Sequence, residues 1–295
     1  MPAVSALDPA WLAKLEALRL SVRWVRWGSR MGGRFAINRR GSSVEFADYA
    51  AYTPGDDIRS IDWNLYARSD RLFVKTYKEE IELAVEIFID ATASMGLPTP
   101  RKFERACQLA QALAYIGLAG RHHVRFSAVA PGRMLASAWG VHRAAITRLS
   151  DWLGPLKPGG QTTLSDWTHR ALTALRIRGG QAILLTDGMA HPADFFRAMH
   201  LLRMRHAEVK VIQVLSPEEF HPAQLMRSGL LVDSETGLTH ELGYSAAELE
   251  RAVHDHNEQL ARFCKRNGIP FAQYRLDEPL EAFVMTTLPA RGFVE

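Results

Sequence analysis

The feature that most constrains the fold is an alternation, from residue 83 to the C-terminus, of short apolar runs with longer segments that carry apolar residues at helical spacing. The short runs predict buried strands at 83–89, 124–130, 181–185, 208–215 and 270–276. The helical spacing predicts helices at 103–119, 141–153, 164–177, 192–205 and 245–266. Strands that alternate with helices form βαβ units with right-handed crossovers. The pattern therefore predicts an α/β fold with a doubly wound, mainly parallel sheet.

Residues 1–80 lack this alternation. A short helix is predicted at 9–20, and a glycine- and arginine-rich connection follows at 28–41. Strands and loops are expected between 43 and 78, around the turn at Pro54-Gly55. We therefore expect two parts: an N-terminal helix, arginine-rich linker and β/loop extension at 1–80, and the sheet domain at 81–295. Two short runs at 230–233 and 238–241 predict a small hairpin inserted before the last helix.

The composition is that of a soluble globular protein, since apolar residues make up 47% of the 295 residues and charged residues 23%. No segment approaches the roughly 18 uninterrupted apolar residues that cross a bilayer. Residues 1–10 lack the basic and apolar regions of a signal peptide. The two cysteines, Cys107 and Cys264, lie in helical patterns, which fits a reducing compartment. We therefore expect a cytoplasmic protein without a membrane span.

Oxygen-bearing side chains follow two of the predicted strands and one glycine pair. They are Asp90, Thr92 and Ser94 after strand 83–89, Asp187 after strand 181–185, and Thr162 and Thr163 after the glycines at 159–160. Ligands of an open parallel sheet bind outside the carboxyl ends of its strands, so we expect these groups to meet in one crevice. Hydroxyl and carboxylate oxygens suit a hard divalent cation such as Mg²⁺. The alternative is that these residues are helix N-caps and an Asp-Gly turn.

Motifs of nucleophilic or nucleotide-dependent catalysis are absent from the sequence. It has no Gly-x-Ser-x-Gly elbow, no phosphate loop with Gly-Lys-Ser/Thr, and no Gly-x-Gly-x-x-Gly after a strand. The 11 histidines lack zinc spacing. These absences favour a non-enzymatic role. The alternative is a metal-dependent hydrolase that acts on a phosphate-containing substrate.

A basic stretch without acidic residues lies between Glu16 and Glu45. Its arginines, with Trp24 and Trp27 among them, are Arg19, Arg23, Arg26, Arg30, Arg34, Arg39 and Arg40. Such a segment predicts contact with phosphate, an anionic membrane surface or an acidic protein. If the protein binds nucleic acid, Arg19–Arg40 is the candidate surface, because arginines contact backbone phosphates. The alternative is that these arginines pair with acids further along the chain or form a solvated face. Because no motif of nucleic-acid recognition accompanies them, we do not expect nucleic acid to be the partner.

A second motif lies within residues 41–77. It reads Val-Glu-Phe-Ala-Asp-Tyr at 44–49, Tyr-Thr-Pro-Gly-Asp-Asp-Ile-Arg at 52–59, Ile-Asp-Trp at 61–63 and Ala-Arg at 67–68. Its matched charges predict a structural network, because arginine binds carboxylates through two parallel hydrogen bonds, and we expect Trp63 to pack beneath the Pro-Gly turn. The alternative is a face for partner docking. The residues of this network are Asp56, Asp57, Arg59, Asp62, Trp63 and Arg68.

Over about residues 34–215, this motif and the Asp-x-Thr-x-Ser-Met turn at 90–95 resemble the Domain of Unknown Function 58 family, whose members have a von Willebrand factor A-like fold. The oxygen-bearing set also resembles the metal-ion-dependent adhesion site of von Willebrand factor A domains. The resemblance implies Mg²⁺, or Mn²⁺ or Ca²⁺, bound by Asp90, Thr92, Ser94, Thr162 and Asp187, with Thr163 as the competing choice. Thr92 stands where those domains carry a serine, and it retains the hydroxyl.

The same resemblance implies a function. It indicates a non-enzymatic, intracellular protein-binding adaptor whose metal ion receives an acidic side chain of a client protein. Proteins of this family are commonly associated with MoxR-type AAA+ ATPases. We therefore expect such an ATPase as a partner in the remodelling or assembly of the client.

Overall fold

The computed structural model describes residues 8–22, 36–38, 45–55, 58–78, 82–99, 101–130, 133–160, 163–175, 180–206, 208–220, 230–232, 239–241 and 246–295. The chain forms two compact units, one made of Met1–Phe35 and Leu83–Glu295 and the other of Ala36–Glu82. Several residues singled out in the sequence lie outside the described residues. They are Thr162, Asp56, Asp57 and every arginine of the basic stretch except Arg19.

The larger unit contains a sheet in which six strands follow the order β11-β8-β7-β4-β5-β6. Their bounds are β4 Glu82–Ile89, β5 His123–Ala130, β6 Arg133–Ala136, β7 Gln181–Thr186, β8 Glu208–Leu215 and β11 Phe271–Arg275. All neighbours along this path are parallel except β5 and β6, which are antiparallel. The chain winds outward from β4 in one direction and from β7 in the other. The predicted doubly wound, mainly parallel sheet is therefore confirmed, and its switch point lies between β4 and β7.

The predicted strands agree with the observed ones to within one residue at each end. The match is close because β7 and β8 are buried along their whole length, and a strand covered on both faces appears in the sequence as a continuous apolar run. The edge strand β6 was not predicted. It has only four residues and is held by its hairpin-like pairing with β5, so it leaves no periodic pattern in the sequence.

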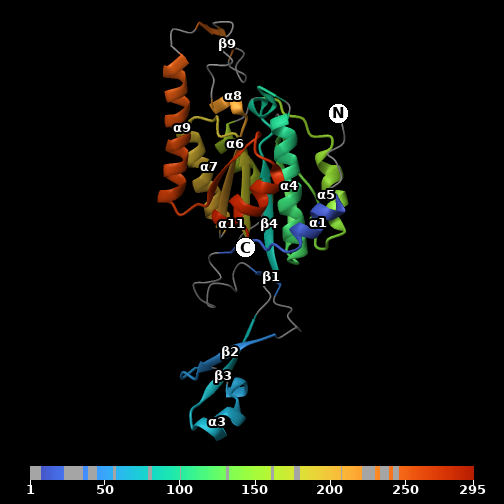
Figure 1. Cartoon of the computed structure of the whole chain (residues 1–295), viewed down its shortest axis with the longest axis vertical. Helices are drawn as coiled ribbons and strands as arrows, with labels where there is room; N and C mark the ends of the chain where they lie inside the picture. Colours follow the sequence, from blue (N-terminus) through green and yellow to red (C-terminus); the bar gives the residue numbers. More distant parts are fainter. Residues whose placement is uncertain are drawn as a thin grey trace. The chain divides into compact units, whose positions relative to one another are not determined.

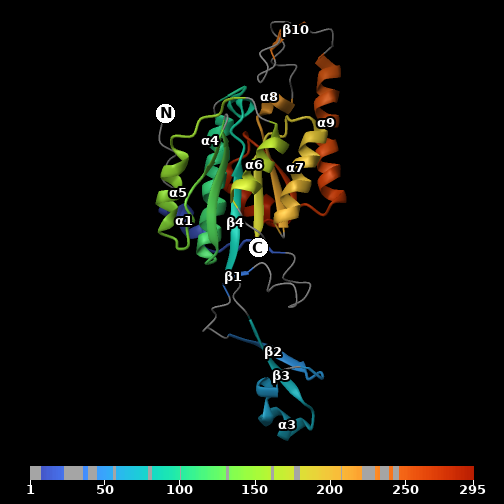
Figure 2. The ribbon, with the colours of Figure 1, turned by 180° about the vertical axis from the view of Figure 1, so that it is seen from behind.

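Helices cover both faces of this sheet. Figure 1 shows α4 and the C-terminal α11 in front of it, and Figure 2, from behind, shows α6 and α7 over the opposite face. The ring of Phe88 on β4 meets the ring of Trp167 on α6 edge-on, with centroids 5.2 Å apart, a geometry that contributes about 1 kcal/mol beyond the buried area. The helices are α4 Arg101–Ala119, α5 Ala145–Leu153, α6 Leu164–Leu175, α7 Pro192–Arg205, α8 Pro217–Phe220, α9 Ala246–Arg266, α10 Leu280–Ala282 and α11 Leu288–Ala290.

The N-terminal helix α1 (Pro9–Leu15) belongs to the larger unit rather than to the extension with which the sequence grouped it. After this helix, Leu20 forms an antiparallel bridge with Val294. The buried ammonium of Lys210 on β8 donates to the carbonyl of Ser21 at 2.6 Å. These contacts join both ends of the chain to the sheet, across sequence separations that periodicity does not reveal.

The smaller unit contains an antiparallel pair of strands, β2 (Glu45–Ala51) and β3 (Phe73–Lys78), and the short strand β1 (Ala36–Asn38). Helix α3 (Trp63–Ser69) lies between β2 and β3 in sequence, after a 3₁₀ turn at Ile58–Ser60. The sequence did not indicate α3, because the helix has only seven residues and none of them is buried.

The predicted hairpin before the last helix is confirmed, since β9 (Leu230–Val232) pairs antiparallel with β10 (Thr239–Glu241). Among the helices in the described part of the chain, none combines the length and the apolar character needed to cross a bilayer.

Candidate metal centre

Asp90 directly follows the carboxyl end of β4, next to the switch point between β4 and β7. Its backbone N–H donates to the carbonyl of Leu185 on β7 at 2.9 Å, which fixes the residue between the two strands. Its Oδ1 accepts from the backbone N–H of Thr92 at 2.9 Å, and its Oδ2 accepts from the hydroxyl of Thr186 at 2.7 Å. The side chain is buried, so the carboxylate has a fixed position and direction.

The hydroxyls of Thr92 and Ser94 lie side by side, with 3.0 Å between the two oxygens, and both residues are buried. Two neighbouring ligands of an octahedral ion at about 2.1 Å would lie about 3 Å apart, so this spacing fits Mg²⁺. Thr92 is the N-cap residue of the 3₁₀ turn Ala93–Gly96, yet its side chain makes no capping hydrogen bond. The capping alternative therefore does not account for this hydroxyl, which is hydrogen-bonded to that of Ser94.

Asp187 follows β7 on the other side of the switch point and is also buried. Its Oδ1 accepts from the backbone N–H of Met189 at 3.0 Å, which is the expected Asp-Gly turn. Its Oδ2 accepts from the ammonium of Lys102 at 2.9 Å. The turn and the metal-site interpretations are compatible at this residue, because each carboxylate oxygen has a second lone pair.

Lys102, at the start of α4, is a member of this cluster that the sequence did not single out. Its side chain is fully buried, and its ammonium donates to Glu219 on α8 at 2.6 Å as well as to Asp187. A signal was present in the sequence: Lys102 shares a helix face with the buried Ala106 and Leu109, where a charge is out of place. Thr186 was also missed, although it directly precedes Asp187.

The electrostatics of the cluster are those of a site with excess negative charge. Burial raises the pKa of Asp90, and the nearby charge of Asp187 raises it further. Burial also raises the pKa of Glu219. Burial alone would lower the pKa of Lys102, but Asp187 and Glu219 outweigh it and the pKa is raised. A divalent cation at the site would stabilise the ionised form of Asp90, whose pKa is raised by burial and by Asp187.

The glycine pair that precedes the remaining predicted ligand is held against the first turn, because the N–H of Gly159 donates to the carbonyl of Ala91 at 2.8 Å. Thr162 itself lies outside the described residues. Thr163 is exposed, and its hydroxyl accepts from the N–H of Asp166 at 3.3 Å, as a residue that caps α6 does. The choice between Thr162 and Thr163 stays a prediction.

The donor set itself decides which kind of ion fits. Among the described residues, no group of three or more histidine, cysteine, aspartate or glutamate side chains is arranged to hold a metal ion. An ion at the switch point would therefore depend on the hydroxyls of Thr92 and Ser94 together with Asp90 and Asp187. Such neutral and anionic oxygens fit Mg²⁺ or Mn²⁺ and do not fit a soft ion.

The sequence profile of the family described as "Protein of unknown function DUF58" matches residues 48–261. The chain belongs to the DUF58 family. Uncharacterized proteins of Mycobacterium tuberculosis (Rv1480) and Mycobacterium bovis (Mb1516) are each 26% identical to this DUF58 protein in an alignment of 294 positions, which covers 96% of this chain and 90% of theirs.

Two solved structures that are similar to this DUF58 protein, one of them a VWA domain, illustrate its structural neighbours. The conserved hypothetical protein BatB from Bacteroides thetaiotaomicron is 16% identical with a TM-score of 0.41, and the match covers 70% of this chain and 96% of that one. The VWA domain of SpRpn10 is 11% identical with a TM-score of 0.41, and the match covers 70% and 95%. At these scores neither structure bears on the function of this chain.

The second motif of this DUF58 protein forms part of the smaller unit. Asp62 is buried and caps α3, because its Oδ1 accepts from the N–H groups of Asn64 and Leu65 at 2.9 and 3.1 Å. Its Oδ2 accepts from the hydroxyl of Tyr49 at 3.0 Å. Asp62 therefore connects β2 to α3, and its predicted pairing with an arginine stays a prediction.

The other members of the predicted network differ in their placement. Trp63 does not pack beneath the Pro-Gly turn as expected: it is 59% exposed and meets Tyr66 edge-on, because it is the first residue of α3 and this helix has no buried face. Arg59 and Arg68 are exposed. Asp56 and Asp57 lie outside the described residues, so the network as a whole stays a prediction.

Of the basic stretch, the structure describes the side chain of Arg19 alone. Its guanidinium donates to the carbonyls of Glu16 and Leu18 at 2.7 and 2.9 Å. These bonds satisfy two backbone carbonyls just after the C-terminal end of α1. Binding of nucleic acid or phosphate by this stretch stays a prediction.

Proposed function

We propose that this DUF58 protein is a non-enzymatic protein-binding module that holds a divalent cation between β4 and β7. The observation that carries the proposal is the pair of buried hydroxyls of Thr92 and Ser94, 3.0 Å apart, beside the buried carboxylates of Asp90 and Asp187. Thr162, or Thr163 in its place, completes the ligand set. The ion is Mg²⁺, with Mn²⁺ and Ca²⁺ as substitutes.

The neutral hydroxyls of the ligand set support recognition of a carboxylate. Neutral hydroxyls take little positive charge from the ion, so the ion remains electrophilic toward an added anionic ligand. An acidic side chain of a client protein is such a ligand, and it fills the position that water occupies in its absence. Binding therefore depends on the ion and on an aspartate or glutamate of the client.

The surroundings of the site support binding over hydrolysis. The ring of His256 on α9 lies near this loop, but its Nε2 is 2.7 Å from the carbonyl of Gly188. A carbonyl only accepts, so Nε2 must carry the proton and is not available to take one from water. Through Nε2, His256 thus holds the loop after Asp187 in place.

The family resemblance supports the remaining part of the proposal. We propose that the partner is a MoxR-type AAA+ ATPase and that the two proteins act together in the cytoplasm on the assembly or remodelling of an acidic client. In this arrangement the DUF58 protein selects the client through the metal ion, and the ATPase supplies the mechanical work.

The test has two stages. First, titration calorimetry with Mg²⁺ and Mn²⁺ compares the wild type with Asp90→Asn, which keeps the shape of the side chain, and with Asp151→Asn, an exposed aspartate on α5. We expect the wild type and Asp151→Asn to bind the ion and Asp90→Asn to bind at least about tenfold more weakly. Equal binding by all three proteins would refute the site.

The second stage is a pull-down from the native lysate with Mg²⁺, with a chelator, and with Asp90→Asn as bait. We expect an AAA+ ATPase or an acidic client only in the Mg²⁺ lane with the wild-type bait. Recovery of the same proteins in all lanes would remove the metal from the interface, whatever the calorimetry shows.

A further inference from the structure

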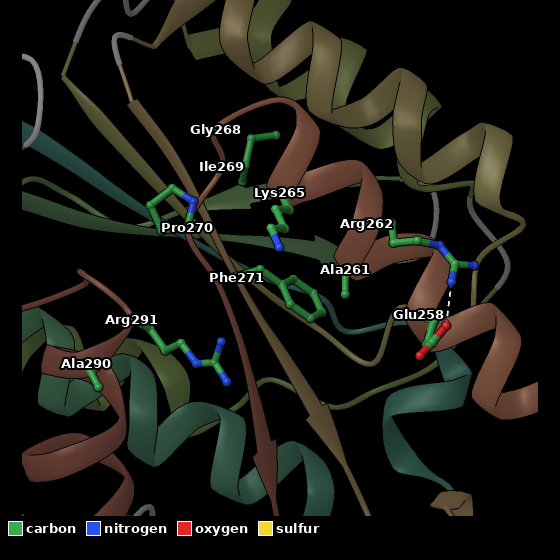
Figure 3. A pocket seen from close by; sticks show the side chains of 10 residues that line it. All are labelled: Glu258, Ala261, Arg262, Lys265, Gly268, Ile269, Pro270, Phe271, Ala290 and Arg291. Carbon is green, nitrogen blue, oxygen red and sulfur yellow. Dashed lines mark hydrogen bonds and ion pairs between the residues drawn. The ribbon is translucent and has the colours of Figure 1, made fainter.

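A hollow of about 620 Å³ lies at the start of β11, the last strand in the sheet order. Figure 3 shows its lining, with Lys265 and Arg262 on α9, Phe271 at the start of β11, and Arg291 in the turn after α11. Because β11 runs parallel to β8, β7 and β4, its start lies at the end of the sheet opposite to Asp90 and Asp187. The hollow is therefore separate from the candidate metal centre.

The backbone of β11 has an open edge next to this hollow. The carbonyl of Pro270 accepts from Val211 on β8 at 2.9 Å, and the N–H of Leu276 donates to Leu215 at 3.0 Å. Backbone groups of successive residues point to opposite edges of a strand, so Phe271 and Gln273 direct their N–H and C=O groups away from β8. No described strand pairs with that edge. Unpaired donors and acceptors of this kind accept an additional strand.

Positive charge surrounds the open edge. Lys265 and Arg291 are exposed, and neither side chain has a hydrogen bond or an ion pair among the described residues. Arg262 is also exposed but pairs with Glu258 one helical turn away. Three cations against one carboxylate give the lining a net charge of +2. A strand that added here would be favoured by acidic side chains.

Apolar surface supplies the floor of the hollow. The ring of Phe271 is half-buried, and Ile269 and Pro270 next to it are buried. A smaller hollow of about 150 Å³ shares Glu258 and Ala261 with the first and continues along α9 to Gln273. The two together follow β11 from its first residue to its middle, as an extended chain would.

We propose that the open edge of β11 binds an extended acidic segment of a partner protein, which adds to the sheet as an outer strand. The backbone of the segment pairs with Phe271 and Gln273, its carboxylates meet Lys265 and Arg291, and an apolar side chain rests on Phe271. This mode combines affinity from main-chain hydrogen bonds with specificity from side-chain pockets. A nucleotide or free phosphate would use the cations but would leave the strand edge unpaired.

The test uses a fluorescein-labelled peptide of alternating glutamate and valine, with the full-length protein and a chelator present so that the candidate metal centre plays no part. We expect saturable binding that weakens with added salt, together with slower hydrogen exchange at the amides of Phe271 and Gln273. The same peptide methylated on its backbone nitrogens should not bind. Lys265→Glu and Arg291→Glu should each weaken binding at least about tenfold.

The matched control is Arg170→Glu, a charge reversal at an exposed arginine on α6, which should leave the affinity unchanged. All three positions are exposed, so the variants should fold as the wild type does. Equal binding of the N-methylated peptide would show that only carboxylates are recognised and would overturn strand addition. Absence of binding at millimolar peptide, or an equal effect of all three charge reversals, would also overturn the proposal.

Discussion

Replacement of Lys102 by methionine tests the electrostatic argument most directly. Methionine is similar in length and fills the same space, but it leaves Asp187 and Glu219 without their counter-charge. The lysine side chain is fully buried, and those of Asp187 and Glu219 are 2% and 12% exposed, so solvent screens the loss only weakly. Breaking a buried ion pair by removing one partner costs about 3–5 kcal/mol. Domains of ordinary stability unfold with about 5–15 kcal/mol, so the loss is a large fraction of the total.

The assay is urea denaturation of the wild type and of Lys102→Met, with Lys14→Met as the matched control. Lys14 pairs with Glu281 at the surface, where both side chains are more than half exposed. An exposed pair contributes about 0–1 kcal/mol. We therefore expect a small loss of unfolding free energy for Lys14→Met and a loss several times larger for Lys102→Met. Similar losses for the two variants would refute the view that Lys102 neutralises a buried cluster.

The effect of pH on Lys102→Met has a definite sign. The pKa of Glu219 is already above its ordinary value of 4.5 because of burial, and Lys102 opposes that rise. Without the lysine the folded-state pKa rises further, so the folded state binds a proton more readily than the unfolded state. Stability then falls as pH rises from about 4.5 through the folded-state pKa. The loss should be smaller at pH 5 than at pH 8, and added Mg²⁺ should restore part of it at pH 8.

Three further predictions concern single contacts. Thr186→Val removes the 2.7 Å hydrogen bond to Asp90 and the 3.1 Å bond from the N–H of Gly188, and it should lower the unfolding free energy by about 1–3 kcal/mol. Thr173→Val on the exposed face of α6 should change it little, and equal effects in urea denaturation would contradict the assigned bonds. Gly180→Ala should lower the unfolding free energy by about 2 kcal/mol or more, since φ is +79° and an added Cβ would lie 2.1 Å from the carbonyl oxygen of Ala84. At Gly159 an added Cβ meets nothing within 4 Å, so Gly159→Ala should leave the unfolding free energy nearly unchanged. Burial raises the pKa of the Cys107 and Cys264 thiols to about 12, so neither should react with a thiol reagent at pH 8 until the protein unfolds; rapid labelling of the native protein would contradict this.

Much of the sheet could be read from the sequence, because burial on both faces leaves a local mark. β8 was predicted with its observed bounds, and β4 and β7 to within a residue, since covered parallel strands are continuous apolar runs. The polar residues that end β4 and β7 could be placed together for the same reason, once the strands were predicted to be parallel. β6 and α3 left no such mark, because one is a short edge strand and the other has no buried face.

The sequence by itself determined the fold class, the family and the oxygen-bearing residues at the switch point, since each of these depends on local periodicity or on a local motif. The tertiary structure decided which side chains pair with those buried carboxylates. Lys102 meets Asp187 and Glu219 across 85 and 117 residues of chain, and Asp90 meets Thr186 across 96. It also decided that β11 is an edge strand among the described strands, with the exposed cations Lys265 and Arg291 beside it. Contacts between distant segments depend on how the strands are ordered in space, and no local pattern in the sequence records that order.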